Sequence, residues 1–529
     1  MNIALKRFYK KIGQYDVLML LMMWGILYGP YIFSGGFTQD DWSFLTFPHD
    51  FTNYFDYQWF ILSISTLTTR PAIAILTGIC YWFFGTHAWA YHLVNLAFFE
   101  GSILLFYQAI RKAFSSEIAF LTTGLALVYP LASTTVFAAI AMNLNFAALL
   151  WSGALYLATK KQSIKVIVLT AFLLLLSTLA YEAFIPLFLL NILIAFLSQE
   201  DARAKLAKLI FSIAPVFVAI SLKGVYQIYF EKLIFGTQFS RIHIPSLLDM
   251  LHKFSVSLKS GVRITLVDSV NISIRALSNL KLLSPYYLVI VFVFLGGLGL
   301  YIYKYAMAAK AEQNTSYVAE FIYRHTTVRI DGFPYLDAVV FAVVIFCSSF
   351  LIFVLSDYIP NSLGYENRTL EAIRFSTAIL IILVTKSMYH MLRYSFLKKA
   401  VVLILFALIS FFMLSMIGQR EAWIAAARYN DYLLGRIALA IRDKGLDDEK
   451  SFTLVAELPK EFPNQINQEP IFGTSWDLSS ALSLMYPEIK IDANVLWPPA
   501  TVMDSNGITI FGYWKAVYPF NFYSYQENT

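Results

Sequence analysis

The segment Ala400–Gly418 reads AVVLILFALISFFMLSMIG and contains no charged residue. As a helix it is long enough to cross the apolar core of a lipid bilayer, which is about 30 Å thick. Similar apolar runs recur elsewhere, for example at Val166–Ala180 and Tyr286–Leu300. Only 14% of the 529 residues are charged, whereas a soluble domain averages about 25%. We therefore predict a mainly α-helical, polytopic membrane protein, and we exclude a soluble enzyme, a nucleic-acid-binding protein and a disordered scaffold.

Hydropathy along the chain indicates about eleven transmembrane helices. The predicted spans are 17–34, 88–110, 117–133, 138–158, 164–180, 183–198, 207–229, 286–303, 337–355, 372–392 and 400–418. Pro71–Gly85 is also apolar but is shorter than a comfortable crossing. If it does not cross, nearly all lysines and arginines of the short loops lie on the same side as the N-terminus. Because cytoplasmic loops are enriched in these residues, we predict that Pro71–Gly85 is an interfacial or re-entrant helix, with the N-terminus inside and the C-terminus outside.

This topology divides the chain into two parts. Residues 1–418 form the predicted transmembrane module, with large outer loops at 35–87 and 230–285. Residues 419–529 form a predicted small α/β domain on the outer side.

The pattern within the C-terminal part predicts two helices and three strands. Ala422–Lys444 is typical of a helix that lies along the membrane surface, and Asp477 is placed to cap a helix over 478–486. The predicted strands are Phe452–Glu457, Ile489–Leu496 and Ile508–Trp514.

An acidic pair follows the first span directly, in the stretch Gly35-Gly36-Phe37-Thr38-Gln39-Asp40-Asp41-Trp42. Adjacent side chains diverge, so one carboxylate can face a cavity while the other binds within the fold. A carboxylate at this position could act as general base on a hydroxyl group or hold a metal ion. The structural alternative is that the pair caps the helix that follows.

The rest of the first outer loop has a recognisable order of features. An aromatic stretch at 53–69 is followed by Arg70-Pro71, by the short helix ending in Phe84-Gly85, and by Tyr91–Asn95 at the outer end of the next span. With Glu182 at a later outer turn, this order resembles the GT-C superfamily of integral membrane glycosyltransferases, whose first outer loop carries an acidic pair and two surface helices. The resemblance covers about the first 200 residues, including Glu182. It implies transfer of a sugar from a polyprenyl-phosphate carrier to a hydroxyl group of an O-antigen or other envelope glycan, on the periplasmic face of a bacterial inner membrane.

This chemistry needs a base near the acceptor, a cation for the departing phosphate and an apolar path for the prenyl chain. Asp40 or Asp41 can supply the base, with a marginal preference for Asp40, and Arg70 can pair bidentately with a phosphate. The candidate phosphate-binding residues of the second outer loop are Arg241, Lys259 and Arg263, and the candidate substrate-binding or supporting residues are Glu182, His92, Asn95, Glu366 and Arg368. For most of these basic residues a solvated surface role is the simpler interpretation. No metal site and no certain cofactor are identified, and a divalent ion stays open because no ligand spacing is diagnostic.

Two alternative functions remain at this point. A polysaccharide polymerase or ligase would depend on the basic residues of loop 230–285 more than on the acidic pair. A lipid or solute transporter is less favoured, because transporters place charged groups along a path at the midplane, whereas most polar groups here gather on one face. An ionisable side chain inside a transmembrane span costs free energy, so we expect Glu100 to be functional or paired. The side chains of Lys386 and His390 are expected to reach the lipid headgroups.

Overall fold

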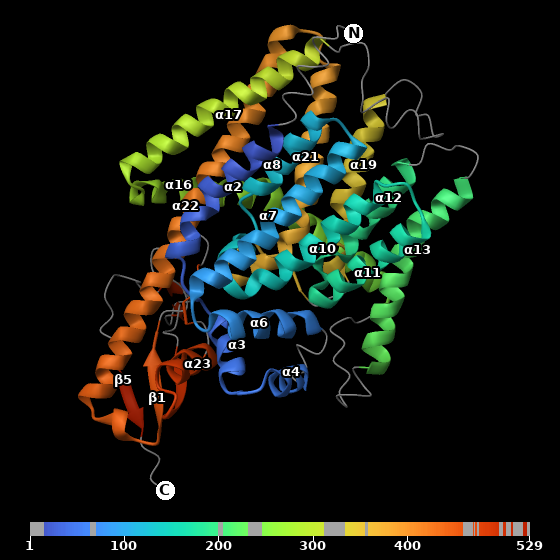
Figure 1. The fold of residues 1–529 in the computed structure, drawn as a ribbon. Helices are drawn as coiled ribbons and strands as arrows, with labels where there is room; N and C mark the ends of the chain where they lie inside the picture. Colours follow the sequence, from blue (N-terminus) through green and yellow to red (C-terminus); the bar gives the residue numbers. More distant parts are fainter. Residues whose placement is uncertain are drawn as a thin grey trace.

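The computed structural model describes residues 15–63, 70–198, 205–230, 246–311, 334–354, 358–458, 469, 471–472, 475–496, 501–503, 509–511 and 522–525. It is a bundle of long apolar helices with a small sheet at one end (Figure 1). Among these residues, eight stretches are long and apolar enough to cross a membrane. They centre on α2 (Asp16–Ser34), α7 (Ala88–Ala113), α10 (Met142–Ala158), α13 (Lys205–Val225), α17 (Pro285–Ala311), α19 (Pro334–Ser348), α21 (Glu371–Met391) and α22 (Ser395–Asp443).

Four further apolar helices are shorter than a full crossing. They are α6 (Pro71–Phe84), α8 (Ser116–Val128), α11 (Ile164–Ala180) and the stretch Glu182–Phe196, which joins η2 (Glu182–Leu187) to α12 (Phe188–Ser198). Three of the eleven predicted spans fall on α8, α11 and α12. The helical membrane architecture agrees with the sequence, while the count of eleven crossings stays a prediction.

Polar contacts show which helix ends lie together at one end of the bundle. Asp16 at the start of α2 accepts hydrogen bonds from Tyr107 near the end of α7 (2.6 Å) and from Tyr301 on α17 (2.7 Å). Lys386 near the end of α21 pairs with Glu117 at the start of α8. We call this the Asp16 end, and the opposite end of the bundle the Asp40 end. Lys386 is thus held by a carboxylate, whereas the sequence indicated a side chain reaching the headgroups.

Three short helices of the first outer loop lie at the Asp40 end. They are α3 (Asp40–His49), α4 (Tyr54–Ser63) and α6, which runs crosswise to the long helices (Figure 1). Tyr57 and Gln58 both donate to the Ala74 carbonyl, at 3.3 and 3.1 Å, and so tie α4 to α6. Gly78 allows this approach, because a Cβ there would lie 2.5 Å from the Tyr57 ring.

α22 is one continuous helix of 49 residues, about 75 Å long at 1.5 Å per residue. The prediction of a separate surface helix over Ala422–Lys444 is therefore wrong, because this stretch continues α22 directly, while the end of the crossing at Gly418 stays a prediction. The physical reason is that Gln419 and Arg420, which mark the end of the apolar run in the sequence, are both buried against other helices. Gln419 donates to the Pro130 carbonyl at 3.0 Å, so the polar residues continue the helix without reaching water.

Arg420 compensates for a proline in α2. Pro30 lacks the N–H group that would bond to the Ile26 carbonyl four residues earlier. The Arg420 guanidinium donates to the carbonyls of Ile26 (3.0 Å) and Leu27 (3.1 Å), and the Tyr287 hydroxyl also donates to Ile26. An unpaired carbonyl in an apolar layer costs several kcal/mol, so this arginine has a structural role.

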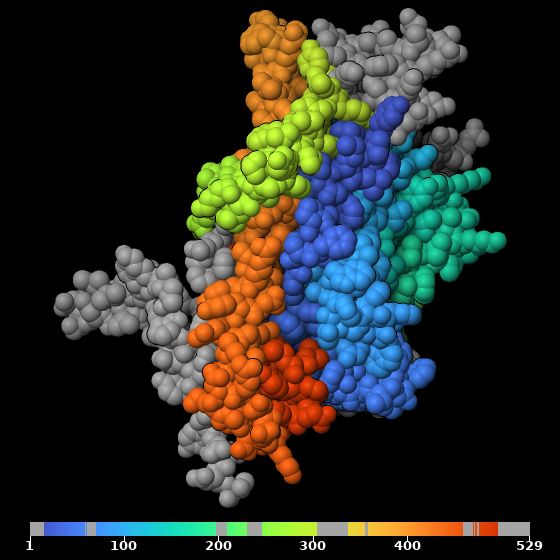
Figure 2. Space-filling view, turned by 60° about the vertical axis from the view of Figure 1, so that its left-hand side comes forward, coloured from blue at the N-terminus to red at the C-terminus, as the bar shows by residue number. Residues whose placement is uncertain are grey.

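The C-terminal residues form a βαβ unit with a core of its own. β1 (Ser451–Glu457) and β2 (Lys490–Leu496) are parallel, and α23 (Ser475–Met485) connects them. β5 (Phe522–Tyr525) pairs antiparallel with β1, and β3 (Thr501–Met503) pairs with β4 (Thr509–Phe511) in a separate ribbon. The core of the unit contains Leu433, Ile437, Leu454, Leu482 and Ile491. Figure 2 shows this part against the lower half of α22 and the first-loop helices.

The predicted elements of this unit are correct in part. Strands 452–457 and 489–496 and the helix over 478–486 coincide with β1, β2 and α23. Of the predicted strand 508–514, Thr509–Phe511 forms β4 outside the main sheet, whose third strand is β5, and the other residues of the prediction lie outside the described residues. Asp477 lies in the first turn of α23 and not before it, and its carboxylate accepts from the Ser43 hydroxyl of α3 at 3.3 Å. Whether residues 419–529 fold as an independent domain stays a prediction.

Candidate functional site

Asp40 and Arg368 are brought together at one end of the bundle. Asp40 begins α3, and Arg368 lies in η7 (Tyr365–Leu370), directly before α21. The Asp40 Oδ2 atom is 3.4 Å from Arg368 Nη1, and the two side chains are 21% and 22% exposed. Both residues are candidates from the sequence, and their ion pair is partly exposed.

Asp41 turns the opposite way and is buried, with 3% exposure. Its carboxylate accepts hydrogen bonds from the backbone N–H groups of Ile140 (2.7 Å), Thr38 (2.9 Å) and Ala139 (3.3 Å). Burial raises the pKa of Asp41 to about 7, against the opposing effect of these three N–H donors. Asp41 therefore does not cap the helix that follows the acidic pair, and its carboxylate instead binds N–H groups of η1 (Ala139–Ala141).

Backbone strain lies next to Asp40. Gln39 has φ 45° and ψ −120°, a region that residues other than glycine rarely adopt and that costs about 1–3 kcal/mol. Such strain persists only where surrounding contacts enforce it. Here Asp41 supplies the enforcing contact, because it is anchored just beyond the strained residue.

A second group of charges lies at the same end. Arg70 Nε is 2.8 Å from Glu182 Oε2, and Lys223 Nζ is 3.8 Å from Glu182 Oε1. The Arg70 guanidinium also covers the Tyr181 ring, 4.0 Å from its centre. Burial opposes ionisation of Glu182, but the positive charges of Arg70 and Lys223 hold its pKa below the usual value.

The two charged groups share one electrostatic neighbourhood. Burial lowers the pKa of the Arg70 guanidinium, and the nearby positive charge of Arg368 lowers it as well. Glu182 raises this pKa by more, so it lies above its usual value. We call Asp40, Arg368, Arg70, Glu182 and Lys223 the Asp40 cluster. It contains three cations and two carboxylates, and this excess of positive charge suits a phosphate-bearing ligand. Lys223 was not a candidate from the sequence, although a lysine inside the apolar span 207–229 is a signal of function or pairing.

The cluster rests on a buried linker between α8 and α10. The predicted spans 117–133 and 138–158 implied a short outer turn here. Instead, residues 129–141 form irregular backbone with α9 (Ser133–Phe137) and η1, and all of these residues are buried. Such backbone is tolerated at membrane depth only where protein groups satisfy its polar atoms.

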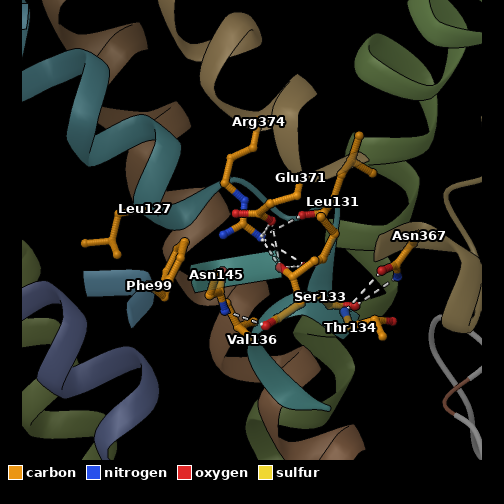
Figure 3. A network of polar contacts seen from close by, with 12 residues as sticks. Phe99, Leu127, Leu131, Ser133, Thr134, Val136, Asn145, Asn367, Glu371 and Arg374 are labelled. Carbon is orange, nitrogen blue, oxygen red and sulfur yellow. Dashed lines mark hydrogen bonds and ion pairs between the residues drawn. The ribbon is translucent and has the colours of Figure 1, made fainter. Parts of the chain in front are cut away.

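Side chains from three helices supply those partners, and Figure 3 shows those of Arg374, Glu371 and Asn145. Arg374 donates to the Leu131 carbonyl (3.2 Å) and the Ala132 carbonyl (3.0 Å). Thr135 donates through its hydroxyl to Glu371 at 2.7 Å. The Thr135 carbonyl accepts from the amide groups of Asn95 (3.0 Å) and Asn145 (2.7 Å).

The same linker holds both partners of the Asp40–Arg368 pair. Asn367, next to Arg368, accepts from Thr134 N–H and donates to the Ser133 hydroxyl, each at 3.1 Å. Asp41, next to Asp40, binds the other end of the linker at Ala139 and Ile140. The position of Asp40 relative to Arg368 is therefore set through buried neighbours on each side.

The remaining candidates from the sequence have other surroundings. His92 is fully buried and lies 3.2 Å from the Gly36 carbonyl, and Asn95 is fully buried on the linker. His92 thus contacts the first outer loop and Asn95 contacts the linker, as a supporting role requires, and the role of either residue towards a substrate stays a prediction. Glu366 is exposed on η7. Glu100 is buried, and neither of its carboxyl oxygens has a hydrogen-bond partner among the described residues.

The basic residues of the second outer loop lie apart from the cluster. Arg241 falls outside the described residues. Lys259 and Arg263 are exposed on α15 (Leu247–Arg263), and Arg263 is 3.9 Å from Asp268 of the adjoining turn. Within the part of the chain that the structure describes, no ion pair or hydrogen bond joins either residue to the Asp40 cluster.

The described residues contain no group of three or more His, Cys, Asp or Glu side chains that could hold a metal ion. The sequence matches no known protein-family model, and no curated protein is significantly similar to it.

Proposed function

We propose that the protein is a membrane glycosyltransferase that moves a sugar from a polyprenyl-phosphate carrier to a hydroxyl group, with inversion at the anomeric carbon. The observation that carries this proposal is the Asp40–Arg368 pair, partly exposed and 3.4 Å apart, beside the partly buried Arg70 and the buried Lys223. A base and an anion-binding group are thus available at one end of an apolar helical bundle.

Asp40 is the general base of the proposal, and Asp41 is not. The oxygens of Asp41 are occupied by three backbone N–H groups in a buried position. Asp40 is partly exposed, and Arg368 holds its carboxylate in place. A base must lie within hydrogen-bond reach of the proton that it accepts, and only Asp40 of the two meets that condition for a substrate outside the protein.

The reaction balances with these groups. The acceptor hydroxyl oxygen forms a bond to the anomeric carbon while the carbon–oxygen bond to the carrier phosphate breaks, and the hydroxyl proton passes to Asp40. The polyprenyl phosphate departs with the electron pair of the broken bond. Arg70 and Lys223 stabilise the developing negative charge on that phosphate, and Glu182 orients Arg70.

The proposal includes a topology and a setting. The proposed topology has eleven crossings with Asp40 outside, and the crosswise α6 suits an interfacial helix. The C-terminal unit packs on α3, where the Thr46 hydroxyl donates to the Ser480 carbonyl at 3.2 Å, so it is placed to bind an acceptor glycan near Asp40. The bacterial inner membrane, with the site facing the periplasm, is the setting that the GT-C resemblance suggests.

The test is transfer by the purified full chain from a panel of undecaprenyl-phosphate-linked hexoses, measured as release of undecaprenyl phosphate. Asp40→Asn should lower turnover by about 10²–10⁴, the usual contribution of a general base, without changing the thermal unfolding midpoint. Asp492→Asn, an exposed carboxylate of β2, is the matched control and should keep full activity. Full turnover in Asp40→Asn would overturn the assigned base. Transport of a donor without any released carrier would favour a transporter instead.

A further inference from the structure

A long helix outside the Asp40 cluster lies across the ends of several candidate spans. It consists of α15, the π turn η5 (Ile264–Asp268) and α16 (Ser269–Leu277), without a break. A Cβ on Gly261 would lie 2.0 Å from the Phe350 ring, and a Cβ on Gly418 of α22 would lie 2.0 Å from the Ala276 carbonyl oxygen. Phe350 belongs to the candidate span 337–354 and Gly418 ends the apolar run of α22. The helix therefore contacts the ends of two apolar runs.

The helix is seated through small side chains. Ser257, Gly261, Thr265, Ser269 and Ser273 face the bundle at four-residue spacing, and all five are buried. A four-residue spacing drifts around an ordinary α-helix of 3.6 residues per turn. The wider winding of the π turn corrects that drift, so one small-residue face stays on the bundle along the whole helix.

Two different stripes are left exposed on the outer side. One is aliphatic, with exposed fractions of 38–62%, and consists of Leu251, Val262, Leu266, Val270 and Ile274. The other carries the exposed cations Lys259, Arg263 and Arg275, and Lys281 follows in the next turn. An aliphatic stripe beside a cationic stripe is the pattern of a helix in the headgroup region of a bilayer.

We propose that α15–α16 is an interfacial anchor whose exposed cations bind the phosphate groups of anionic phospholipids in the leaflet at the Asp40 end. The inference is independent of the proposed enzymatic function. The aliphatic stripe gives the lipid chains a surface to cover, and the cations lie beside it at the level of the headgroups. Each basic residue near an anionic membrane surface strengthens binding roughly fivefold. This assigns Lys259 and Arg263 to lipid phosphates, away from the reaction centre.

The first test measures which phospholipids remain bound to the purified full chain after extraction from vesicles of equal phosphatidylglycerol and phosphatidylcholine content. The wild-type protein should retain phosphatidylglycerol preferentially. The variant Lys259→Gln/Arg263→Gln/Arg275→Gln/Lys281→Gln should lose at least fivefold of that preference. The matched control, Arg436→Gln/Lys444→Gln/Lys450→Gln/Lys490→Gln, removes four exposed cations of the C-terminal unit and should keep it. An unchanged preference in the first variant, or an equal loss in the control, would overturn the proposal.

A second measurement separates the lipid surface from the carrier lipid and locates the helix. If the first variant loses binding of added undecaprenyl phosphate but keeps its phosphatidylglycerol preference, the cations serve the carrier and the proposal fails.

A fluorophore on Leu266→Cys, in a background with Cys80 and Cys347 replaced by alanine, should be quenched by lipids labelled in the upper acyl chain. The same fluorophore on Asn271→Cys should be quenched by aqueous iodide. Quenching of Leu266→Cys by iodide alone would place the aliphatic stripe in water and contradict the anchor.

Discussion

The two ends of the helical bundle both contain charged and polar contacts, but they differ in balance. At the Asp16 end, Lys386 pairs with a single carboxylate, and Asp16 is held by two tyrosine hydroxyls. In the Asp40 cluster, three cations lie among two carboxylates, on irregular backbone and next to a strained residue. Matched contacts between regular helix ends hold a fold together. Excess positive charge on a rigid and irregular support is what an anionic ligand needs.

The support of the Asp40 end can be removed directly. Arg374→Met leaves Glu371 buried without its ion pair at 3.4 Å, removes the guanidinium donor of the Leu131 carbonyl and leaves the Ala132 carbonyl only its bonds from Thr135. Breaking a buried pair in this way costs about 3–5 kcal/mol, so we expect a large fall in the unfolding midpoint in detergent. The double variant Glu371→Gln/Arg374→Met removes the unpaired charge and should recover part of the loss. An unchanged midpoint in Arg374→Met would show that the linker does not depend on this pair.

Asp41 should make the stability of the Asp40 end depend on pH. Its folded pKa of about 7 lies above the ordinary value of 3.8, so its protonated form is favoured in the folded state. Its contribution to the free energy of unfolding is complete below pH 4 and is lost as pH rises through 7. The change is on the order of a few kcal/mol. The stability advantage of the wild-type protein over Asp41→Asn should therefore shrink from pH 4 to pH 7.5 in unfolding measurements. A constant difference would mean that Asp41 does not titrate in this range.

Arg70 and Lys386 offer the same chemical change at opposite ends. Arg70→Gln should weaken donor binding about 10–100-fold, because a hydrogen bond to a charged group is worth about 1.5–3 kcal/mol. Lys386→Gln should leave donor binding unchanged and lower stability by about 1 kcal/mol or less. The measurement that checks both expectations is the affinity of each variant for an undecaprenyl-phosphate hexose. Equal losses in the two would remove the distinction between the ends.

The strained residue gives the smallest expected effect. Glycine adopts the backbone angles of Gln39 without strain, so Gln39→Gly should raise the free energy of unfolding by up to about 1 kcal/mol. Because the loop before Asp40 becomes freer, turnover should fall at the same time. Thermal unfolding and the transfer assay on one preparation measure both changes. Lower stability in Gln39→Gly would argue that the strain is absent in solution.

The sequence predicted the helical membrane architecture and four of the five cluster residues, but not their pairing. Asp40 and Arg368 are 328 positions apart, and Arg70 and Glu182 are 112 apart, so only the tertiary fold brings them together. The linker was missed because residues 129–141 are almost wholly apolar or small, and their polar partners Asn95, Asn367 and Arg374 come from distant helices. The continuity of α22 was missed because Gln419 and Arg420 resemble a membrane boundary, while their actual partners lie on α2 and on the linker.

The most direct test of the account is a cryo-EM structure of the full chain in a lipid nanodisc with undecaprenyl phosphate added. We predict that the phosphate lies within hydrogen-bond distance of Arg70 or Lys223 and faces Asp40. A phosphate found instead beside Lys259 and Arg263, or at the Asp16 end, would contradict the assignment of the Asp40 cluster as the reaction centre.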